Sequence, residues 1–351
     1  MRSSMGQVAT FVLGIVVGIA ANILSSYLWE TPVSKLRQSR RERIAARQAL
    51  ELDAESLGYY RVNAWSPSRP LKPENLRIEV TDSRPAWRWG DEPAWRSHLD
   101  ETSAAISGSC GYPVACSAVD WRESDATQTF RVTISPCDYA EGAATSRLLE
   151  GDPSTRSALA EALRDDPIGF VHTAPPAPLA INVAVVSKSG NFLALQRSAT
   201  VWSARLLWTI GPNETMTLPA SSTPGSRHED FFELARRCLE EELGLLAGDY
   251  GRISISWFGY YAPLASPWVL AQVRTTLAEA EVDERIAGCH STEELAGWEW
   301  LPLTRERVRR IITAEPVGDY GLVSPDEPER RWIVHAPLAV NELWRMQAAL
   351  D

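Results

Sequence analysis

The segment whose residue types and spacing could best carry out chemistry is acidic: HEDFFELARRCLEEELGL, residues 228–245. Its apolar residues recur three and four positions apart, which predicts a helix with one buried stripe and carboxylates over the rest of its surface. Gly244 supplies the stop of this helix. Residues at i, i+3 and i+4 share a helix face, so carboxylates at that spacing can converge on a divalent cation. The alternative is an exposed acidic helix with ordinary ion pairs, such as Glu233 with Arg237.

The spacing within this segment resembles the signature of the Nudix family, G-x5-E-x7-R-E-U-x-E-E-x-G-U, in which U is an aliphatic residue. Glu229 matches the first glutamate, Arg237 follows after seven residues, and residues 239–245 reproduce the end of the signature. The resemblance implies that Glu241 and Glu242 ligate a divalent metal, Mg²⁺ or Mn²⁺, and that they act in catalysis together with Arg237. It also implies that Glu229 and Arg237 brace the helix and the loop before it.

Two positions depart from the signature. Cys238 stands where the family has a glutamate. Because a thiolate is a soft ligand poorly matched to Mg²⁺, we interpret Cys238 as a small buried hydrophobe. Thr223 stands where a glycine is expected six residues before Glu229, although Gly225 is close to that position. Gly211 is the alternative source of the glycine in the substrate loop, if an insertion lies between Gly211 and Glu229.

The general base lies outside the matched residues. Glu214, which we assign to the substrate loop, is one candidate, and Glu293 and Glu294 are two others. Each is also a candidate for an ordinary surface acid, because a loop glutamate is solvated by default.

The flanking sequence fits the fold that the resemblance implies, an α/β/α sandwich around a mixed sheet. Alternating and apolar runs predict strands, the first two joined as a hairpin by a Ser-Gly-Asn turn. These strands are expected at 181–186, 192–198, 201–210, 252–261, 268–277 and 297–303. The segment TRERVRRII, which follows the closing strand, is predicted to be the last helix. The resemblance covers roughly residues 180–350.

Residues 59–175 predict an N-terminal α+β extension. LRIEV (76–80) and FRVTI (130–134) are typical of strands, and SALAEALRDD is typical of a helix. The Pro-rich run APPAP at 174–178 marks a boundary, which leaves residues 176–351 as the Nudix-like domain. Residues 133–149 weakly resemble the extension of the Nudix branch that cleaves UDP-sugars, in which a Tyr-containing helix precedes the first Nudix strand.

The N-terminal region predicts a membrane anchor. Residues 8–28 are apolar, and no charged residue lies between Arg2 and Glu30. A helix of this length spans about 30 Å, the thickness of a hydrocarbon core. A cleaved signal peptide is the alternative, but the basic n-region is only Arg2 and no clear cleavage site follows. We therefore predict one transmembrane helix within residues 1–30.

The charge after this helix predicts its orientation. Lysine and arginine crowd residues 35–47, as they do in cytoplasmic flanks, so the N-terminus is expected outside and the later domains in the cytoplasm. Residues 31–58 then form a basic juxtamembrane helix. Gly14 and Gly18 have the G-x-x-x-G spacing that lets two helices approach closely, which makes a homodimer a hypothesis. Glycine is, however, common in membrane helices generally.

Composition narrows the functional class. The formal net charge of −10 argues against broad binding of nucleic acid, which needs clustered lysine and arginine. Five scattered cysteines without a C-x-x-C pair disfavour a disulfide scaffold or a zinc ribbon. The expected function is a Mg²⁺-dependent hydrolase that cleaves the pyrophosphate bond of a nucleoside diphosphate linked to another moiety. The alternatives are a catalytically weakened module that binds a nucleotide or nucleotide-sugar and signals at the membrane, and a purely structural membrane adaptor.

Overall fold

The computed structural model describes most of the chain beyond its N-terminal region. The described residues are 52, 55, 58–65, 69–81, 87, 92–105, 112–123, 128–201, 204–218, 228–289, 293–317 and 320–348. Nearly all of them belong to one compact unit, Leu50–Trp344. The predicted span at 8–28, its Gly14–Gly18 pair and nearly all of the predicted juxtamembrane helix lie outside these residues. Within the described residues, no helix is both long enough and apolar enough to cross a bilayer.

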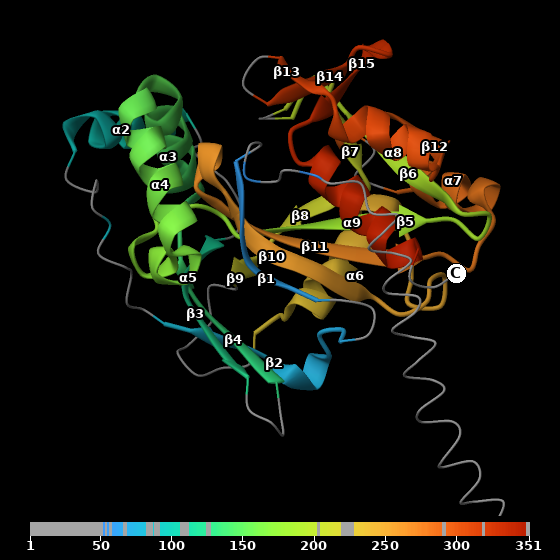
Figure 1. Ribbon diagram of the computed structural model, residues 1–351, viewed down its shortest axis with the longest axis horizontal. Coiled ribbons are helices and arrows are strands. Elements are labelled where there is room, and N and C mark those ends of the chain that lie inside the picture. The colour runs from blue at the N-terminus through green and yellow to red at the C-terminus, as the bar shows by residue number, and fades with distance from the viewer. Residues whose placement is uncertain are drawn as a thin grey trace, which may run out of the picture. The chain divides into compact units, whose positions relative to one another are not determined.

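In the described part of the chain, eleven strands form one large mixed sheet (Figure 1). They are β1 (Tyr59–Ala64), β5 (Ala180–Val186), β6 (Asn191–Arg197), β7 (Trp208–Ile210), β8 (Asn213–Thr215), β10 (Ser254–Tyr261), β11 (Ser266–Arg274), β12 (Leu295–Pro302), β13 (Glu315–Val317), β14 (Gly321–Ser324) and β15 (Glu327–Ile333). Their order is β1-β10-β11-β5-β6-β7-β15-β14-β13, with β8 beside β5 and β12 beside β6. The β11–β5 and β15–β7 pairs are parallel, so the predicted mixed sheet is confirmed.

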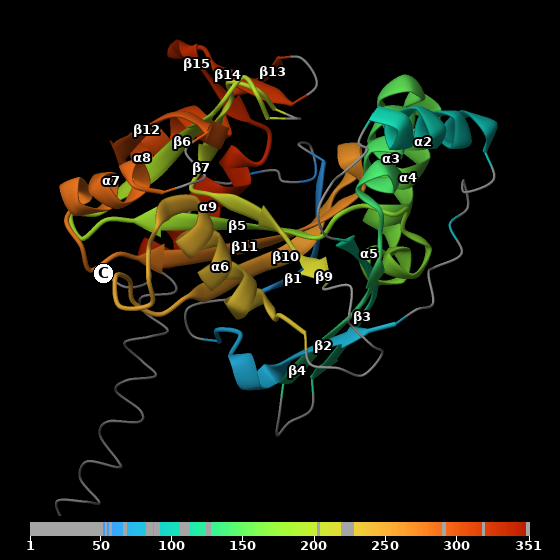
Figure 2. The same ribbon diagram turned by 180° about the vertical axis from the view of Figure 1, so that it is seen from behind.

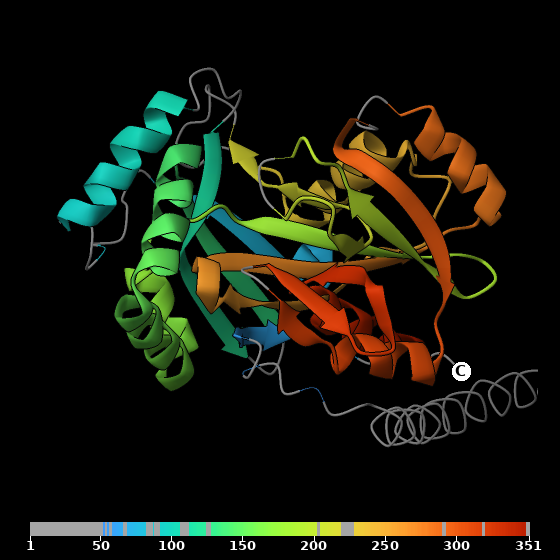
Figure 3. The same ribbon diagram turned by 90° about the horizontal axis from the view of Figure 1, so that it is seen from above.

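Helices pack on both faces of this sheet. The described helices are α2 (Pro93–Ala105), α3 (Tyr139–Gly151), α4 (Pro153–Asp165), α5 (Pro167–Phe170), α6 (Phe231–Leu243), α7 (Glu279–Ala287), α8 (Arg305–Ile312) and α9 (Ala336–Ala348). Successive residues of a strand point to opposite faces. In β5, Ile181 and Val183 share a core with α6, whereas Ala184 and Val186 share a core with α8 and α9. Figure 3 shows the gold helix and the red helices on opposite sides of the strands.

The β5–β6 hairpin opens soon after its turn. The two strands share one register pair, Val186 with Phe192. Beyond it, β6 pairs with β7 and β5 pairs with β8, and Gly211 lies between β7 and β8. On one side the Gly211 N–H donates to the carbonyl of Leu193, and on the other the Val183 N–H donates to the carbonyl of Pro212, both at 2.9 Å. At Gly211 the chain therefore crosses from the β6 half of the sheet to the β5 half.

Replacing Gly211 with alanine is expected to destabilise the fold by about 2 kcal/mol or more. A Cβ at this position would lie 2.0 Å from the carbonyl oxygen of Val183, and the φ of +70° is one that L side chains rarely adopt. The measurement is the free energy of unfolding of the purified chain. Gly248→Ala is the matched control, because a Cβ there meets no atom within 4 Å. Equal losses in the two variants would contradict the role of Gly211 in the crossing.

A second, smaller sheet has four strands among the described residues (Figure 2). Its order is β2 (Leu76–Val80), β4 (Gln128–Pro136), β3 (Tyr112–Glu123) and β9 (Thr217–Leu218). Three of them precede β5 in the chain, and the fourth, β9, follows β8. Phe130 of β4 meets Phe258 of β10 edge to face, with ring centroids 5.6 Å apart, so its core continues into that of the large sheet. β1, which lies before the predicted boundary at 175, also joins the large sheet. The domain boundary therefore stays a prediction.

Two predicted elements differ from those observed. The strand expected at 201–210 is only β7, because Ala204 and Leu206 both have positive φ values, which interrupt an extended chain. The helix expected to be the last is α8, and β13, β14, β15 and α9 all follow it. A helix at that position is therefore confirmed, but it is not the last one that the structure describes.

Candidate active site

Local sequence sets both ends of α6. The Asp230 carboxylate accepts hydrogen bonds from the Phe232 and Glu233 N–H groups at 2.8 Å, and the Glu233 carboxylate accepts one from the Asp230 N–H at 3.0 Å. This reciprocal capping box satisfies N–H groups that have no partner inside the helix. Gly244 ends α6 with a left-handed φ of 65°, as its position in the sequence predicts. The helix thus holds its apolar stripe in the core and its acids outside it.

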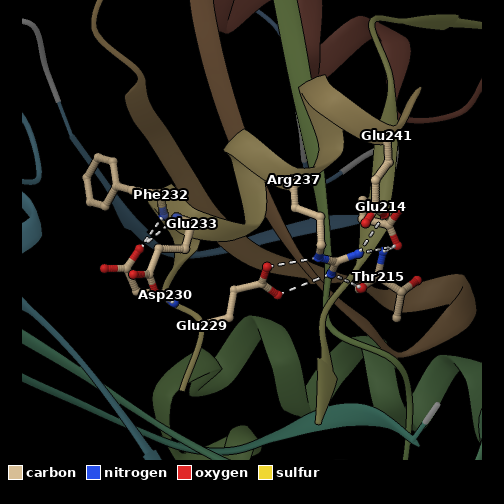
Figure 4. A network of polar contacts seen from close by, with 8 residues as sticks. All are labelled: Glu214, Thr215, Glu229, Asp230, Phe232, Glu233, Arg237 and Glu241. Carbon is tan, nitrogen blue, oxygen red and sulfur yellow. Dashed lines mark hydrogen bonds and ion pairs between the residues drawn. The ribbon is translucent and has the colours of Figure 1, made fainter. Parts of the chain in front are cut away.

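Arg237 joins the acidic residues around α6 (Figure 4). Its guanidinium donates to both carboxylate oxygens of Glu229, at 2.9 and 3.1 Å, and to the Thr215 carbonyl at 3.0 Å. Its Nη1 lies 3.3 Å from Glu241 Oε2 and 3.4 Å from Glu214 Oε1. Burial disfavours the charge, but the Glu229 hydrogen bonds and the surrounding carboxylates outweigh it and raise the pKa of Arg237. One side chain therefore fixes the entry to α6, the strand β8 and the second half of the helix.

Glu242 lies among like charges. Burial, together with the charges of Glu294 and Glu214, raises its pKa to about 8, against the lowering effect of Arg197. Burial likewise raises the pKa of Glu214. A half-buried carboxylate surrounded by other carboxylates favours whatever brings positive charge to it, a proton or a cation.

The donor set fits one kind of metal site. Within the described residues, no three His, Cys, Asp or Glu side chains lie close enough together to enclose a metal ion. Mg²⁺, however, is commonly held by one or two carboxylates, with waters and phosphate oxygens completing its octahedron. The carboxylates around Glu242 therefore suit an open Mg²⁺ site of this kind by their charge and not a closed protein cage, and Glu241 and Glu242 stay predicted ligands.

Cys238 is part of the core and not of the site. It has no exposed surface, and it belongs to the same hydrophobic cluster as Leu234 and Leu239. Burial raises the pKa of its thiol well above the usual value, and the charges of Glu214 and Glu242 raise it further. The thiol is thus neutral, and the interpretation of Cys238 as a small buried hydrophobe is confirmed.

The residues assigned to the substrate loop differ in their contacts. Glu229 and Glu214 both meet Arg237, whereas Gly211 lies at the strand crossing. Thr223 and Gly225 lie outside the described residues. Of the candidate bases, Glu214 and Glu294 carry charges that act on Glu242. The functional roles of all these residues stay predictions.

Two further side chains lie near these carboxylates: Arg197, which was not anticipated, and Tyr139, from the predicted Tyr-containing helix. Arg197 ends β6, and its Nη1 donates to Asn213 Oδ1 at 3.4 Å. Burial lowers the pKa of Arg197, while the charges of Glu294 and Glu242 raise it. Tyr139 begins α3, and burial raises its pKa, with Arg197 lowering it and Glu294 raising it. The available signal for Arg197 was that it is the one ionisable residue in the strand NFLALQR.

No protein-family model and no curated protein matches this chain. Among solved structures, it is similar to a protein from Deinococcus radiodurans, with 16% identity over 48% of this chain and 82% of that one, at a TM-score of 0.29. It is similar to a MutT Nudix hydrolase from Burkholderia pseudomallei, with 16% identity over 36% and 83%, at a TM-score of 0.24. A third is an ADP-ribose pyrophosphatase from Streptococcus suis 89-1591, with 10% identity over 50% and 92%, at a TM-score of 0.26. Because these TM-scores are low, the similarities carry no argument about activity.

Proposed function

We propose that this chain is a divalent-metal-dependent hydrolase that cleaves the pyrophosphate bond of a nucleoside diphosphate linked to another moiety. The observation that carries the proposal is the arrangement around Arg237, which binds Glu229, Glu214 and Glu241 at once. These contacts fix the segment that precedes α6, and the third turn of the helix, against β8. They support a preorganised acidic site of the kind that holds a metal-bound diphosphate.

Each nearby side chain has a proposed task. Glu241 and Glu242 hold the metal, and Arg237 with Glu229 holds the helix in place. When bound, Mg²⁺ would offset the negative charge on the bridging and leaving oxygens, and it would activate water. Arg197 faces these acids from β6 and offers a positive partner to a phosphate. Glu294 is favoured over Glu293 as the proton acceptor, because its charge acts on Glu242.

The alternative is a catalytically weakened module that binds a nucleotide or nucleotide-sugar. Two observations support it. The neutral, buried Cys238 supplies no carboxylate where the signature has one, and the described residues enclose no metal with three protein ligands. Such a module would keep the Arg237 network and lose turnover.

The proposed location is the cytoplasmic face of a membrane. Its support is the sequence alone, namely the apolar residues 8–28 and the basic residues 35–47 that follow. A homodimer through Gly14 and Gly18 belongs to the same proposal.

The test is incubation of the full chain with Mg²⁺ or Mn²⁺ and a panel of dinucleotides, nucleotide-sugars and ADP-ribose. We expect release of a nucleoside monophosphate, measured by ion-exchange chromatography, that EDTA abolishes and added Mg²⁺ restores. A ligand-dependent rise in the melting temperature without product would support the binding module. If neither product nor a thermal shift occurs with any compound, both forms of the proposal are wrong.

A further inference from the structure

A cavity of about 200 Å³ lies beside the acidic site. One wall is a face of α3, formed by Tyr139, Ala143 and Ser146, which are spaced three and four residues apart. The lining also includes Trp268 of β11 and His335, which follows β15. Residues of the N-terminal extension and of the segment after β15 therefore line the same cavity.

The cavity adjoins the residues already described. Arg197 and Asn213, which share a hydrogen bond of 3.4 Å, both line it. Thr215 also lines it, and the Thr215 carbonyl accepts a hydrogen bond from Arg237. The charge of Arg197 acts on Glu242. A ligand in this cavity therefore has a continuous path of polar groups toward Glu241 and Glu242.

The walls favour an uncharged planar group. The rings of Trp268 and His335 lie with centroids 4.6 Å apart, tilted by 37°. Burial and the charge of Arg197 lower the pKa of His335 to about 3, so the ring is neutral, and its Nε2 lies 3.2 Å from Thr209 Oγ1. Among the described residues that line the cavity there is no Asp or Glu.

We propose that this cavity binds the nucleoside of the ligand whose diphosphate lies at Glu241 and Glu242, an inference that rests on the proposed function. The base contacts the rings of Trp268 and His335, because aromatic rings attract one another. The diphosphate extends toward Arg197. The volume is below the about 300–1,000 Å³ of whole-ligand pockets, so the second moiety lies outside it.

This assignment gives the N-terminal extension a task. Helix α3 begins with the Asp138 capping box and presents Tyr139, Ala143 and Ser146 to the cavity. These residues set how far a base can enter, so α3 determines specificity for the nucleoside. Neither the acidic helix nor its signature spacing supplies that function.

The test compares ligands that differ only by the nucleoside. Isothermal titration of the full chain in Mn²⁺ uses methylenediphosphonate and the α,β-methylene analogues of ADP, GDP, CDP and UDP, which resist cleavage. We expect at least one analogue to bind about tenfold or more tightly than methylenediphosphonate. In Ser146→Leu, which fills the cavity, that gain is lost and the affinity for methylenediphosphonate is unchanged. Arg147→Leu is the matched control, because Arg147 on the same helix pairs with Glu101 at the surface and should leave both affinities unchanged.

Two failures are distinguishable. If methylenediphosphonate binds with metal but every analogue binds equally well, or if Ser146→Leu keeps the gain, the nucleoside assignment is overturned and the proposed function stands. If neither methylenediphosphonate nor any analogue shows metal-dependent binding, the proposed function falls and this inference with it. The first of these results needs no variant, so analogues that bind no more tightly than methylenediphosphonate overturn the assignment even if Ser146→Leu fails to fold.

Discussion

Replacing Glu242 with glutamine is expected to lower metal-dependent turnover by about 1,000-fold. A metal ion contributes several kcal/mol to the stabilisation of charge in the transition state, and each 1.36 kcal/mol corresponds to about a tenfold change in rate. The amide keeps the size of the side chain but removes the charge that binds the cation. The measurement is the rate of nucleoside monophosphate release at saturating Mg²⁺, together with the metal-dependent rise in melting temperature, which should also be lost.

The same substitution should stabilise the metal-free protein at alkaline pH. In the folded chain the pKa of Glu242 is about 8, against an ordinary value of 4.5. As the pH rises through this interval the unfolded chain releases its proton first, so the wild-type free energy of unfolding falls. Glutamine has no proton to release and removes this contribution. In EDTA, the stability of Glu242→Gln relative to wild type should therefore be greater at pH 8.5 than at pH 5.

Glu240→Gln is the matched control for both effects. Glu240 lies on the same helix and its side chain is exposed. The substitution makes the same chemical change outside the acidic site, so turnover and the pH dependence of stability should both stay at the wild-type level. Retention of turnover and of the metal-dependent thermal shift in Glu242→Gln would show that Glu242 is no metal ligand.

The parts of the structure that sequence could predict are those governed by neighbouring residues. The start of α6 depends on Asp230 and Glu233, and its stop depends on Gly244, all within the segment itself. The burial of Cys238 follows from the same helical period. Strand β2 was recognisable because its apolar and charged residues alternate, and β4 because three β-branched residues follow one another.

The parts that could not be predicted depend on distant pairing. β8 is three residues long, and nothing in its own sequence shows that it pairs with β5. β13 is exposed at every position, so it has no apolar alternation to indicate a strand. The cavity collects residues from α3, β6, β11 and the segment after β15. Each of those elements has a pattern typical of a core, and a single sequence does not show which residues meet.

Arg237→Lys is expected to be the most damaging conservative substitution in α6. Lysine keeps the positive charge but has no planar fork, so it cannot donate to both oxygens of Glu229 and to the Thr215 carbonyl together. Hydrogen bonds to charged groups contribute about 1.5–3 kcal/mol each where they are partly buried, and we expect a loss of about 3 kcal/mol in the free energy of unfolding. Turnover should fall by about 100-fold, because Glu241 and Glu214 lose the partner that positions them.

Arg236→Lys isolates this effect from a general loss of arginine. Arg236 is the preceding residue of the helix, and its side chain is exposed. Its replacement leaves the contacts of Glu229, Glu214 and Glu241 intact, so both stability and turnover should stay near wild type. Urea unfolding and turnover are measured on the two variants side by side. If Arg237→Lys matches Arg236→Lys in both, the charge at position 237 is sufficient, and the fork geometry that joins α6 to β8 has no role in the site.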